Sequence, residues 1–531
     1  PLSELHFDTE VGGFNRTISK DTIYMLAIIG LAMLLTACIN FVNMASAQAV
    51  QRAKEVGIKK VLGSSKSSLM MHYLGETAFI TIISTGLACL IAHLSYPLMS
   101  EVLGYAPPFD LLALSSVSFL IIIGLATVIL SGLYPALVMA GFRPLEAIRS
   151  SLSRKVGGGL WLRRVLVILQ FGVSQTLIIC TLVVNSQLSY FLSKDLGFDK
   201  DALITIALPE NQSDKYERFT NELSGLPGIS KYSVGNAAAS SGNIWMQGYS
   251  FEGALEDEQF LSHSKYGDEN YIETFGMELL AGRSYRQSDT IREVVINEMM
   301  MSEMGITDPN EALNKTVNIG RTEVPIVGVV RDFNLVSLRE PIQACFIGMD
   351  KGNFQQVFAK VDAEDRQTTI ASIEAAWNAA FPNEQFEYEY LDLQLAQFYE
   401  AEERLSQLFT IFSVIAIFIG CLGLFGMISY MVNQRLKEVG IRKVLGASAV
   451  SVVQLFSIEF VKLLMVAFLV AAPIAYYYMD EWLAEYSFRI DMGVGIFAIA
   501  LLTSLFIALS TVGYRSFRVA TINPVNTLRD E

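Results

Sequence analysis

The sequence predicts an α-helical membrane protein with seven transmembrane helices in two parallel repeats and one α+β extracytoplasmic domain. Three observations predict this fold class. The 531 residues are 52% hydrophobic and only 17% charged, with a mean hydropathy of +0.39, whereas soluble proteins have about 25% charged residues. Seven apolar runs are each long enough for the ~20 residues that a membrane-spanning helix needs. In addition, one basic segment occurs twice in the chain.

The repeated segment follows one apolar run and precedes another in both places. Residues 51–65 read Gln-Arg-Ala-Lys-Glu-Val-Gly-Ile-Lys-Lys-Val-Leu-Gly-Ser-Ser, and residues 434–448 read Gln-Arg-Leu-Lys-Glu-Val-Gly-Ile-Arg-Lys-Val-Leu-Gly-Ala-Ser. The matched positions include charges and glycines, so a shared apolar composition does not explain the repeat.

Each copy of this segment has the pattern of a short basic amphipathic helix. Val56, Lys59, Lys60 and Gly63 share helical spacing, and the complementary arc holds other apolar side chains, which are Ile58, Val61 and Leu62. Such a helix either anchors the topology through positive charge or docks a cytoplasmic partner. The close match between the two copies favours docking, because a topology signal needs only positive charge.

The predicted spans set the order of the chain. They cover about residues 21–47, 70–98, 112–141, 161–192, 404–433, 452–479 and 492–514. Basic residues gather in alternate linkers and at the C-terminus, namely Arg52, Lys54, Lys59, Lys60, Lys66, Arg143, Arg149, Arg154, Lys155, Arg163, Arg164, Arg435, Lys437, Arg442, Lys443, Arg515, Arg518 and Arg529. The short loops on the other side are acidic. The positive-inside rule therefore predicts that residues 1–20 and 196–400 lie outside the cytoplasm.

Six segments follow from this layout. Residues 21–142 form the first repeat of three spans, 143–160 a cytoplasmic linker, 161–195 a span leading outward, 196–400 the outer domain and 401–531 the second repeat. Both repeats end in a matching proline-containing tail, so they face the same way. Residues 1–20 then correspond to the end of another outer domain, and the symmetry predicts one more span and one more domain before Pro1. Residues 2–5 resemble Leu391–Leu393 and are predicted to be the last strand of that domain.

The outer domain alternates strand-like and helix-like stretches without a regular period. The strand-like stretches are 202–208, 294–296, 324–330 and 357–361, and the helical ones are 213–223 and 368–380. We expect a mixed sheet with flanking helices.

Several kinds of chemistry have no motif in this sequence. It contains no Walker A loop, no H-E-x-x-H, no G-x-S-x-G and no Cys/His cluster. A net charge of −14 argues against nucleic-acid binding. The intramembrane charges Glu76 and Glu459 lie near the cytoplasmic ends of their spans, where snorkelling or helix–helix hydrogen bonding is the simplest interpretation. Gly420, Gly423 and Gly426 share one helix face and predict close helix packing.

The repeated K-E-V-G-I-[KR]-K-V-L-G-[AS]-S motif resembles the signature of FtsX/MacB-type ABC transporter permeases. The outer domain is similar to the periplasmic core domain of that family at residues 282–285 (Gly-Arg-Ser-Tyr), 294–298 (Val-Val-Ile-Asn-Glu) and 326–334 (Ile-Val-Gly-Val-Val-Arg-Asp-Phe-Asn). The resemblance covers nearly the whole chain. It departs from the simplest members in fusing two permease halves in one chain. No ATPase domain is attached, so the ATPase would come from another polypeptide.

The resemblance implies a non-catalytic permease subunit in a bacterial cytoplasmic membrane that transmits ATP-driven motion to its outer domain. The expected partners are a cytoplasmic ABC ATPase dimer, membrane lipid, and a periplasmic adaptor or outer-membrane channel. This chain itself would hold no cofactor, because ATP and Mg²⁺ bind the partner ATPase. The residues expected to form its two ATPase-coupling helices are Arg52, Lys54, Glu55, Gly57, Lys59, Lys60, Gly63, Arg435, Lys437, Glu438, Gly440, Arg442, Lys443 and Gly446. Glu55 and Glu438 would pair with basic groups of the ATPase, while Arg52, Lys59, Arg435 and Arg442 would face lipid headgroups or acidic partners.

Two alternatives stay open at this point. An FtsX-like regulatory protein that activates a cell-wall hydrolase, or that signals, would share the lever but transport nothing. A secondary carrier is disfavoured, because charges near the middle of the membrane are lacking. The substrate cannot be read from the sequence.

Overall fold

A computed structural model describes residues 20–103, 110–141, 158–209, 213–252, 260–320, 322–362, 366–434, 438, 441–442 and 444–520. The chain divides into two compact units. The first contains residues up to 185, 404–481 and 491 onward, and the second contains Ser186–Glu403 together with Trp482–Ile490.

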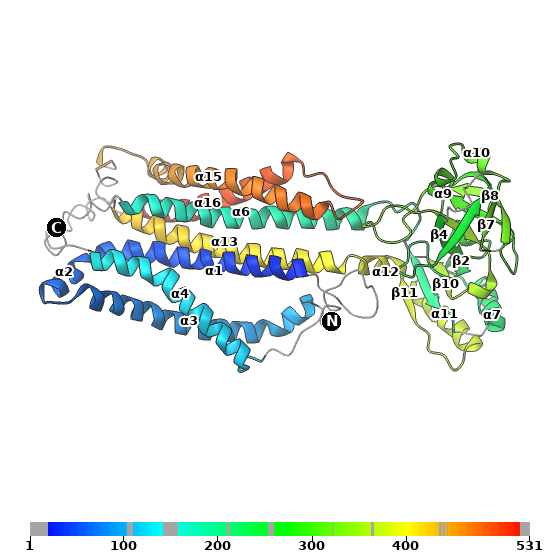
Figure 1. The fold of residues 1–531 in the computed structure, drawn as a ribbon, viewed down its shortest axis with the longest axis horizontal. Helices are drawn as coiled ribbons and strands as arrows, with labels where there is room; N and C mark the ends of the chain where they lie inside the picture. Colours follow the sequence, from blue (N-terminus) through cyan, green and yellow to red (C-terminus); the bar gives the residue numbers. More distant parts are fainter. Residues whose placement is uncertain are drawn as a thin grey trace. The chain divides into compact units, whose positions relative to one another are not determined.

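Seven helices of the described residues are long and apolar enough to cross a membrane, as the sequence predicts. They are α1 (Lys20–Gln51), α3 (Lys66–Leu103), α4 (Leu114–Gly141), α6 (Gly158–Ser193), α13 (Glu400–Gln434), α15 (Ala449–Leu483) and α16 (Val494–Ala520). A short helix α2 (Ala53–Val61) connects α1 to α3. In the helical unit α3 and α4 lie side by side, and α1 packs against α4 (Figure 1).

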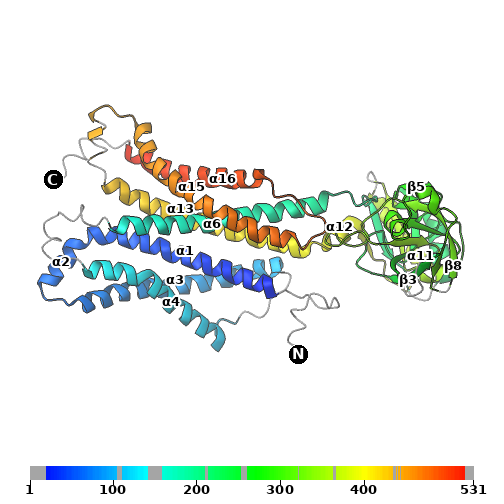
Figure 2. The ribbon, with the colours of Figure 1, turned by 45° about the horizontal axis from the view of Figure 1, so that its top comes forward.

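The predicted glycine stripe on α13 does allow close packing. A Cβ atom at Gly423 would lie 2.8 Å from Gln170 Nε2 and 3.0 Å from Asn40 Oδ1, and one at Gly426 would lie 2.9 Å from Met44 Cγ. Glycines therefore let α1 and α6 approach the backbone of α13. Both views show α6 beside α13 (Figure 1, Figure 2), and the Thr181 hydroxyl bonds with Ser413 at 2.7 Å between them.

The second unit contains two sheets where we expected one mixed sheet. The smaller is antiparallel, in the order β11 (Tyr388–Tyr390), β1 (Leu203–Ala207), β10 (Gln356–Val361) and β2 (Ile229–Gly235). Helices α7 (Ser213–Leu223) and α11 (Arg366–Ala380) share an apolar core with it, in which Trp377 lies edge-on to Phe219. Both helices match the predicted stretches.

The larger sheet has seven strands and closes on itself. Its order is β5 (Leu279–Gly282), β8 (Thr322–Val330), β6 (Val294–Asn297), β9 (Cys345–Gly348), β4 (Phe260–Tyr266), β3 (Met246–Phe251) and β7 (Thr316–Ile319), and β7 also pairs with β8. The pairs β6–β8 and β4–β9 are parallel, so this sheet is mixed. The closing pair β7–β8 is a hairpin of consecutive strands, whereas β4–β9 and β3–β7 join strands far apart in the sequence, so sequence pattern does not predict the strand order. Three short helices, α8 (Tyr271–Thr274), α9 (Glu298–Glu303) and α10 (Pro309–Ala312), lie in its connections.

The three family-like motifs of this domain lie against one another. Gly282 has φ +77°, and a Cβ atom there would lie 2.2 Å from Val327 O, so only glycine fits beside β8. The Asn297 side chain accepts from Met300 N at 3.1 Å and donates to Asp332 Oδ1 at 2.9 Å. These motif residues therefore maintain the fold of the larger sheet.

One expectation about this domain is wrong. Residues 391–393, to which residues 2–5 were likened as a final strand, begin helix α12 (Leu391–Gln397). The final strand is β11, which ends at Tyr390, the residue before the helix. Residues 2–5 themselves lie outside the described residues.

A buried carboxyl group makes the stability of this unit depend on pH. The Ser233 hydroxyl donates to Asp268 Oδ1 at 2.5 Å, and burial raises the pKa of Asp268 to about 7. The fold therefore favours the neutral carboxyl. Its stabilising contribution is complete below about pH 4 and is lost as the pH rises through about 7.

We expect Asp268→Asn to stabilise the unit by about 2–4 kcal/mol at pH 8 and to have little effect at pH 4. Hydrogen-exchange protection of the β2 amides, corrected for intrinsic exchange, measures the difference. Asp289→Asn, on a side chain that is 84% exposed, is the control. Equal effects of Asp268→Asn at both pH values would contradict the assignment.

Candidate coupling site

The first copy of the repeated segment is helix α2, bounded by a turn at each end. Its N-cap residue is Arg52. It ends where Gly63 adopts φ +96°, and Ser64 N donates to Lys59 O at 3.0 Å. Gly446 has φ +94° at the matching place. A left-handed residue after the last turn is the usual role of glycine at a helix end, which explains why both copies have glycine here.

One face of α2 is fixed to the helical unit. Val56 is fully buried in a cluster with Leu69, Tyr73, Ala136, Met139 and Ala140. Lys60 Nζ donates to Ala140 O at 2.7 Å, at the end of α4. Lys60 therefore holds the helix in place.

The opposite arc of α2 is apolar and exposed, and the second copy repeats it. Leu62 is 81% exposed and Leu445 is 82%, while Val61 and Val444 are 65% and 66% exposed. Ile58 and Ile441 are also exposed. Exposed apolar side chains clustered on a short helix are typical of an interaction surface. We call these two sets, Ile58/Val61/Leu62 and Ile441/Val444/Leu445, the apolar arcs.

The charged side chains of the repeated segment form ion pairs within the chain. Glu55 binds Lys59 at 2.7 Å, and Glu438 binds Arg442 at 2.8 Å. Both are exposed pairs one helical turn apart, worth about 0.3–0.5 kcal/mol each. Helical spacing brings them together, and a stronger external partner can exchange with them at little cost.

Arg52 also has an internal partner. Its Nη1 binds Glu76 Oε1 at 3.0 Å, and this contact raises the pKa of Arg52 above its ordinary value. The pairing with Lys59 lowers the pKa of Glu55, and the pKa of Lys59 is raised in turn. Glu459 binds Arg164 of α6 at 2.9 Å, a contact between two helices, which for Glu459 agrees with the helix–helix alternative.

The remaining predicted residues are described in part or not at all. Gly57 is buried, and Lys54 lies within α2. Arg435, Lys437, Gly440 and Lys443 lie outside the described residues. No group of three or more metal-ligating side chains occurs among the residues that the structure describes.

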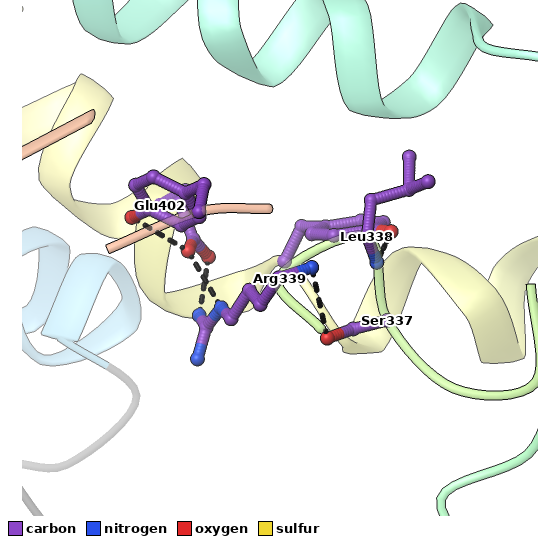
Figure 3. A network of polar contacts seen from close by, with 6 residues as sticks. Ser337, Leu338, Arg339 and Glu402 are labelled. Carbon is purple, nitrogen blue, oxygen red and sulfur yellow. Dashed lines mark hydrogen bonds and ion pairs between the residues drawn. The ribbon is translucent and has the colours of Figure 1, made fainter. Parts of the chain in front are cut away.

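A second polar site, which no sequence motif indicates, joins helix ends to the α+β unit. Arg339, in the loop after β8, binds Glu402 of α13 through two contacts, Nε–Oε1 at 2.9 Å and Nη2–Oε2 at 2.6 Å (Figure 3). The Tyr486 hydroxyl donates to Glu402 Oε1 at 3.0 Å. Glu402 is 3% exposed and Arg339 is 41% exposed. Burial acts to lower the pKa of Arg339, but the bonds to Glu402 more than offset it, and the pKa is raised.

Backbone contacts strengthen the same junction. Ser487 N donates to Arg339 O at 3.0 Å, and Leu338 N donates to the Tyr399 hydroxyl at 3.0 Å. Gln187, near the end of α6, donates to Phe488 O at 2.9 Å. The ends of α6, α13 and α15 therefore form one compact body with the α+β domain. We call this set of contacts the clasp.

The clasp changes the predicted domain layout. Residues 482–490 were expected to be only a short acidic outer loop of the second repeat, yet they pack with Ser186–Glu403. Arg339 and Glu402 are 63 residues apart and belong to no motif. No sequence pattern predicts this pair, because an ion pair between residues so far apart in the sequence depends on how the chain folds.

Comparison with known proteins shows that two segments of the chain match a known family. Residues 27–144 and 410–524 each match the family described as FtsX-like permease C-terminal. The macrolide export ATP-binding/permease protein MacB of Bdellovibrio bacteriovorus is 26% identical over 134 residues, which cover 25% of this chain and 20% of that protein. The chain therefore matches about a fifth of this curated relative.

Two solved structures are similar to part of this chain. The periplasmic region of MacB from Actinobacillus actinomycetemcomitans has 15% identity and a TM-score of 0.28, covering 38% of this chain and 94% of that one. The extracellular domain of the noncanonic ABC-type transporter YknZ from Gram-positive bacteria has 15% identity and a TM-score of 0.26, covering 35% of this chain and 97% of that one. The two matches to the FtsX-like permease C-terminal family, the repeated motif and the seven apolar helices together support an FtsX/MacB-type permease.

Proposed function

We propose that this chain is the transmembrane subunit of a complex in which a separate cytoplasmic ATPase drives motion of the Ser186–Glu403 domain. The observation that carries the proposal is the pair of matched apolar arcs. They present the same three residue types with nearly the same exposure, and each arc lies in a segment that ends in a glycine with a left-handed backbone, Gly63 and Gly446. Two equal docking surfaces suit the two equal subunits of an ATPase dimer.

The fixed face of α2 supports a coupling role for this helix. Val56 and Lys60 attach α2 to α3 and α4, so a force applied to the apolar arc would be transmitted to these membrane-spanning helices. A surface patch on a mobile loop would absorb the same push. ATP and Mg²⁺ would be held by the ATPase, and this chain would contribute no catalytic group.

The clasp supports transmission at the other end of the spans. It contains the last turns of α6, the first turn of α13 and the segment after α15, all packed with the α+β domain. Movement of any of these helix ends would move Leu338 and Arg339 directly. The chain would then act as a lever and need no polar path through the membrane.

The distribution of charge supports the location. The basic linkers support a cytoplasmic location for the coupling helices and a location of the α+β domain outside a bacterial cytoplasmic membrane. Export with the help of an adaptor or outer-membrane channel is one use of such a lever. The regulatory alternative, activation of a cell-wall hydrolase, uses the same coupling and differs only in the outer partner.

Capture of the full-length protein from its native membrane tests the proposal. We expect an ATPase with a Walker A sequence to be recovered in about two copies per chain, with ATP hydrolysis in the eluate. An outer-membrane channel or adaptor in the same eluate would favour export, and a hydrolase would favour regulation. Recovery without any ATPase would refute the coupling function.

A further inference from the structure

Strand β2 forms one edge of the four-stranded sheet in the α+β unit, and half of that edge is open. The strand spans seven residues, whereas β11 at the opposite edge spans three. From Val234 onward the edge is covered, because Asp268 N donates to Val234 O at 2.9 Å and Asn236 N donates to Tyr266 O at 2.8 Å. The segment after β4 therefore lies along β2 as an added strand would, and it turns into α8 before it reaches Tyr232.

The backbone of Tyr232 points away from the rest of its sheet. Gly235 O accepts from Gln355 N on the β10 side at 2.8 Å, whereas Val234 O accepts from Asp268 N on the other side. Backbone groups alternate in direction along an antiparallel pair, so the N–H and C=O of Tyr232 face the same side as those of Val234. Among the residues that the structure describes, no backbone group pairs with Tyr232 on that side. An edge of this kind is a template for another strand.

An open pocket of about 260 Å³ lies along this free half of β2, and we call it the edge pocket. A single water takes about 30 Å³ in the liquid, so the edge pocket has room for a side chain of a bound segment. Its walls come from β2, the end of α7 and the start and end of α8, and include Ser224, Ser230, Tyr232, Asn270, Glu273 and Thr274.

The Thr274 side chain provides a second unpaired polar group in the edge pocket. Thr274 is only 1% exposed, and its Oγ1 has no hydrogen-bond partner within the described part of the chain. A buried hydroxyl without a partner is costly. A polar group that enters the edge pocket would therefore be stabilised by Thr274 as well as by the backbone of β2.

Charge favours a basic occupant. The segment Ser186–Glu403 contains 36 aspartates and glutamates but only 16 lysines and arginines. At the edge pocket Glu273 binds Lys231 at 3.1 Å, and their side chains are 72% and 44% exposed. Exposed pairs of this kind are weak, so a lysine or arginine of an incoming segment can replace Lys231 as the partner of Glu273.

We propose that the free half of β2 binds an extended basic segment of a separate protein as an additional strand. The backbone of that segment pairs with Tyr232, one of its basic side chains binds Glu273, and a neighbouring polar side chain enters the edge pocket beside Thr274. Lys231 is released to solvent in exchange. Binding at this edge requires no ATPase, so it is independent of the coupling function proposed above.

Site-specific photocrosslinking of the full-length protein in its native membrane tests the proposal. A benzophenone side chain replaces Ser230, which is exposed and lines the edge pocket, and mass spectrometry identifies the linked segment. We expect a segment of another protein in which lysine and arginine outnumber aspartate and glutamate. The yield should be at least about fivefold higher than from the same probe at Asn378, which is exposed on α11 and does not line the edge pocket.

Two substitutions at Tyr232 isolate its backbone N–H. Tyr232→Pro and Tyr232→Val both remove the ring, but only proline also removes the donor, on the side that β10 does not use. We expect the crosslink yield from Tyr232→Pro to be about fivefold lower than from Tyr232→Val, as for the loss of one hydrogen bond. Equal yields from these two variants would overturn the proposal.

A third variant tests the charge without altering the sheet. Glu273→Gln, on an exposed side chain, should lower the yield at Ser230 about threefold to tenfold, because a charge-assisted contact is lost. An unchanged yield would contradict a basic occupant. Crosslinks only to lipid, to this chain itself or to a second copy, which mixed isotopic labelling identifies, would also overturn the proposal.

Discussion

Reversing the charge of both repeated glutamates, with Glu55→Lys and Glu438→Lys in one chain, is expected to lower recovery of the ATPase at least tenfold. The change places lysines beside Lys59 and Arg442 on the two coupling helices, and a basic docking partner would meet like charge where it had met carboxylate. The folded chain itself loses only two exposed pairs of about 0.3–0.5 kcal/mol each. A large loss of capture would therefore report docking and not misfolding.

A matched control separates docking from net charge. Glu273→Lys with Glu278→Lys alters the total charge equally and also breaks two surface ion pairs, to Lys231 and Arg331 of the α+β unit. We expect normal ATPase recovery from that control. Leu62→Ser with Leu445→Ser should weaken capture too, because it removes exposed apolar area without changing charge. If the glutamate reversal leaves recovery intact, the repeated helices are topology anchors.

Removing the guanidinium of the clasp, with Arg339→Ala, is expected to destabilise the junction by about 2–4 kcal/mol. Glu402 is 3% exposed, and a buried carboxylate that loses its partner carries an uncompensated desolvation cost. The Tyr486 hydroxyl still donates to Glu402, which keeps the loss below the upper end of the range for buried pairs. Hydrogen exchange across residues 335–340 and 482–490 measures the change.

Glu402 and Arg339 differ in burial, so removing one charge or the other is expected to cost different amounts of stability in the same experiment. Glu402→Gln leaves Arg339 without its partner, but that side chain is 41% exposed and can be hydrated, so we expect a smaller loss of about 1–2 kcal/mol. Arg331→Ala, which breaks an exposed pair with Glu278, should change stability by less than about 0.5 kcal/mol. A loss from Arg331→Ala as large as from Arg339→Ala would mean that the clasp has no special role.

The clasp variant also separates docking from transmission. Arg339 lies far in the sequence from both coupling helices, so Arg339→Ala should retain the ATPase. Addition of ATP with vanadate should alter exchange of residues 335–340 in the wild type, and this response should be lost in the variant. If the Arg339→Ala variant keeps this change in exchange, other contacts between the helix ends and the domain transmit the motion.

Much of this protein was determined by its sequence alone. Apolar length predicted the seven helices, because a backbone in lipid must satisfy its hydrogen bonds within the segment. The match of residues 51–65 with residues 434–448 predicted two similar helices, and helical periodicity predicted the arc of Ile58, Val61 and Leu62. Local physics controls each of these features, since neighbouring residues supply the helical turn, the terminal glycine and the i, i+4 charge pairs.

Only the tertiary structure decided which distant groups meet. It paired Arg339 with Glu402 and Arg164 with Glu459, which are 63 and 295 residues apart. It brought β4 beside β9 and β3 beside β7 in the larger sheet, and it packed Val167 and Phe171 of α6 into one cluster with residues of α13, α15 and α16. The physical reason is that an ion pair or a strand pairing depends on where the chain returns in space, and residue type specifies the ability to pair but not the partner.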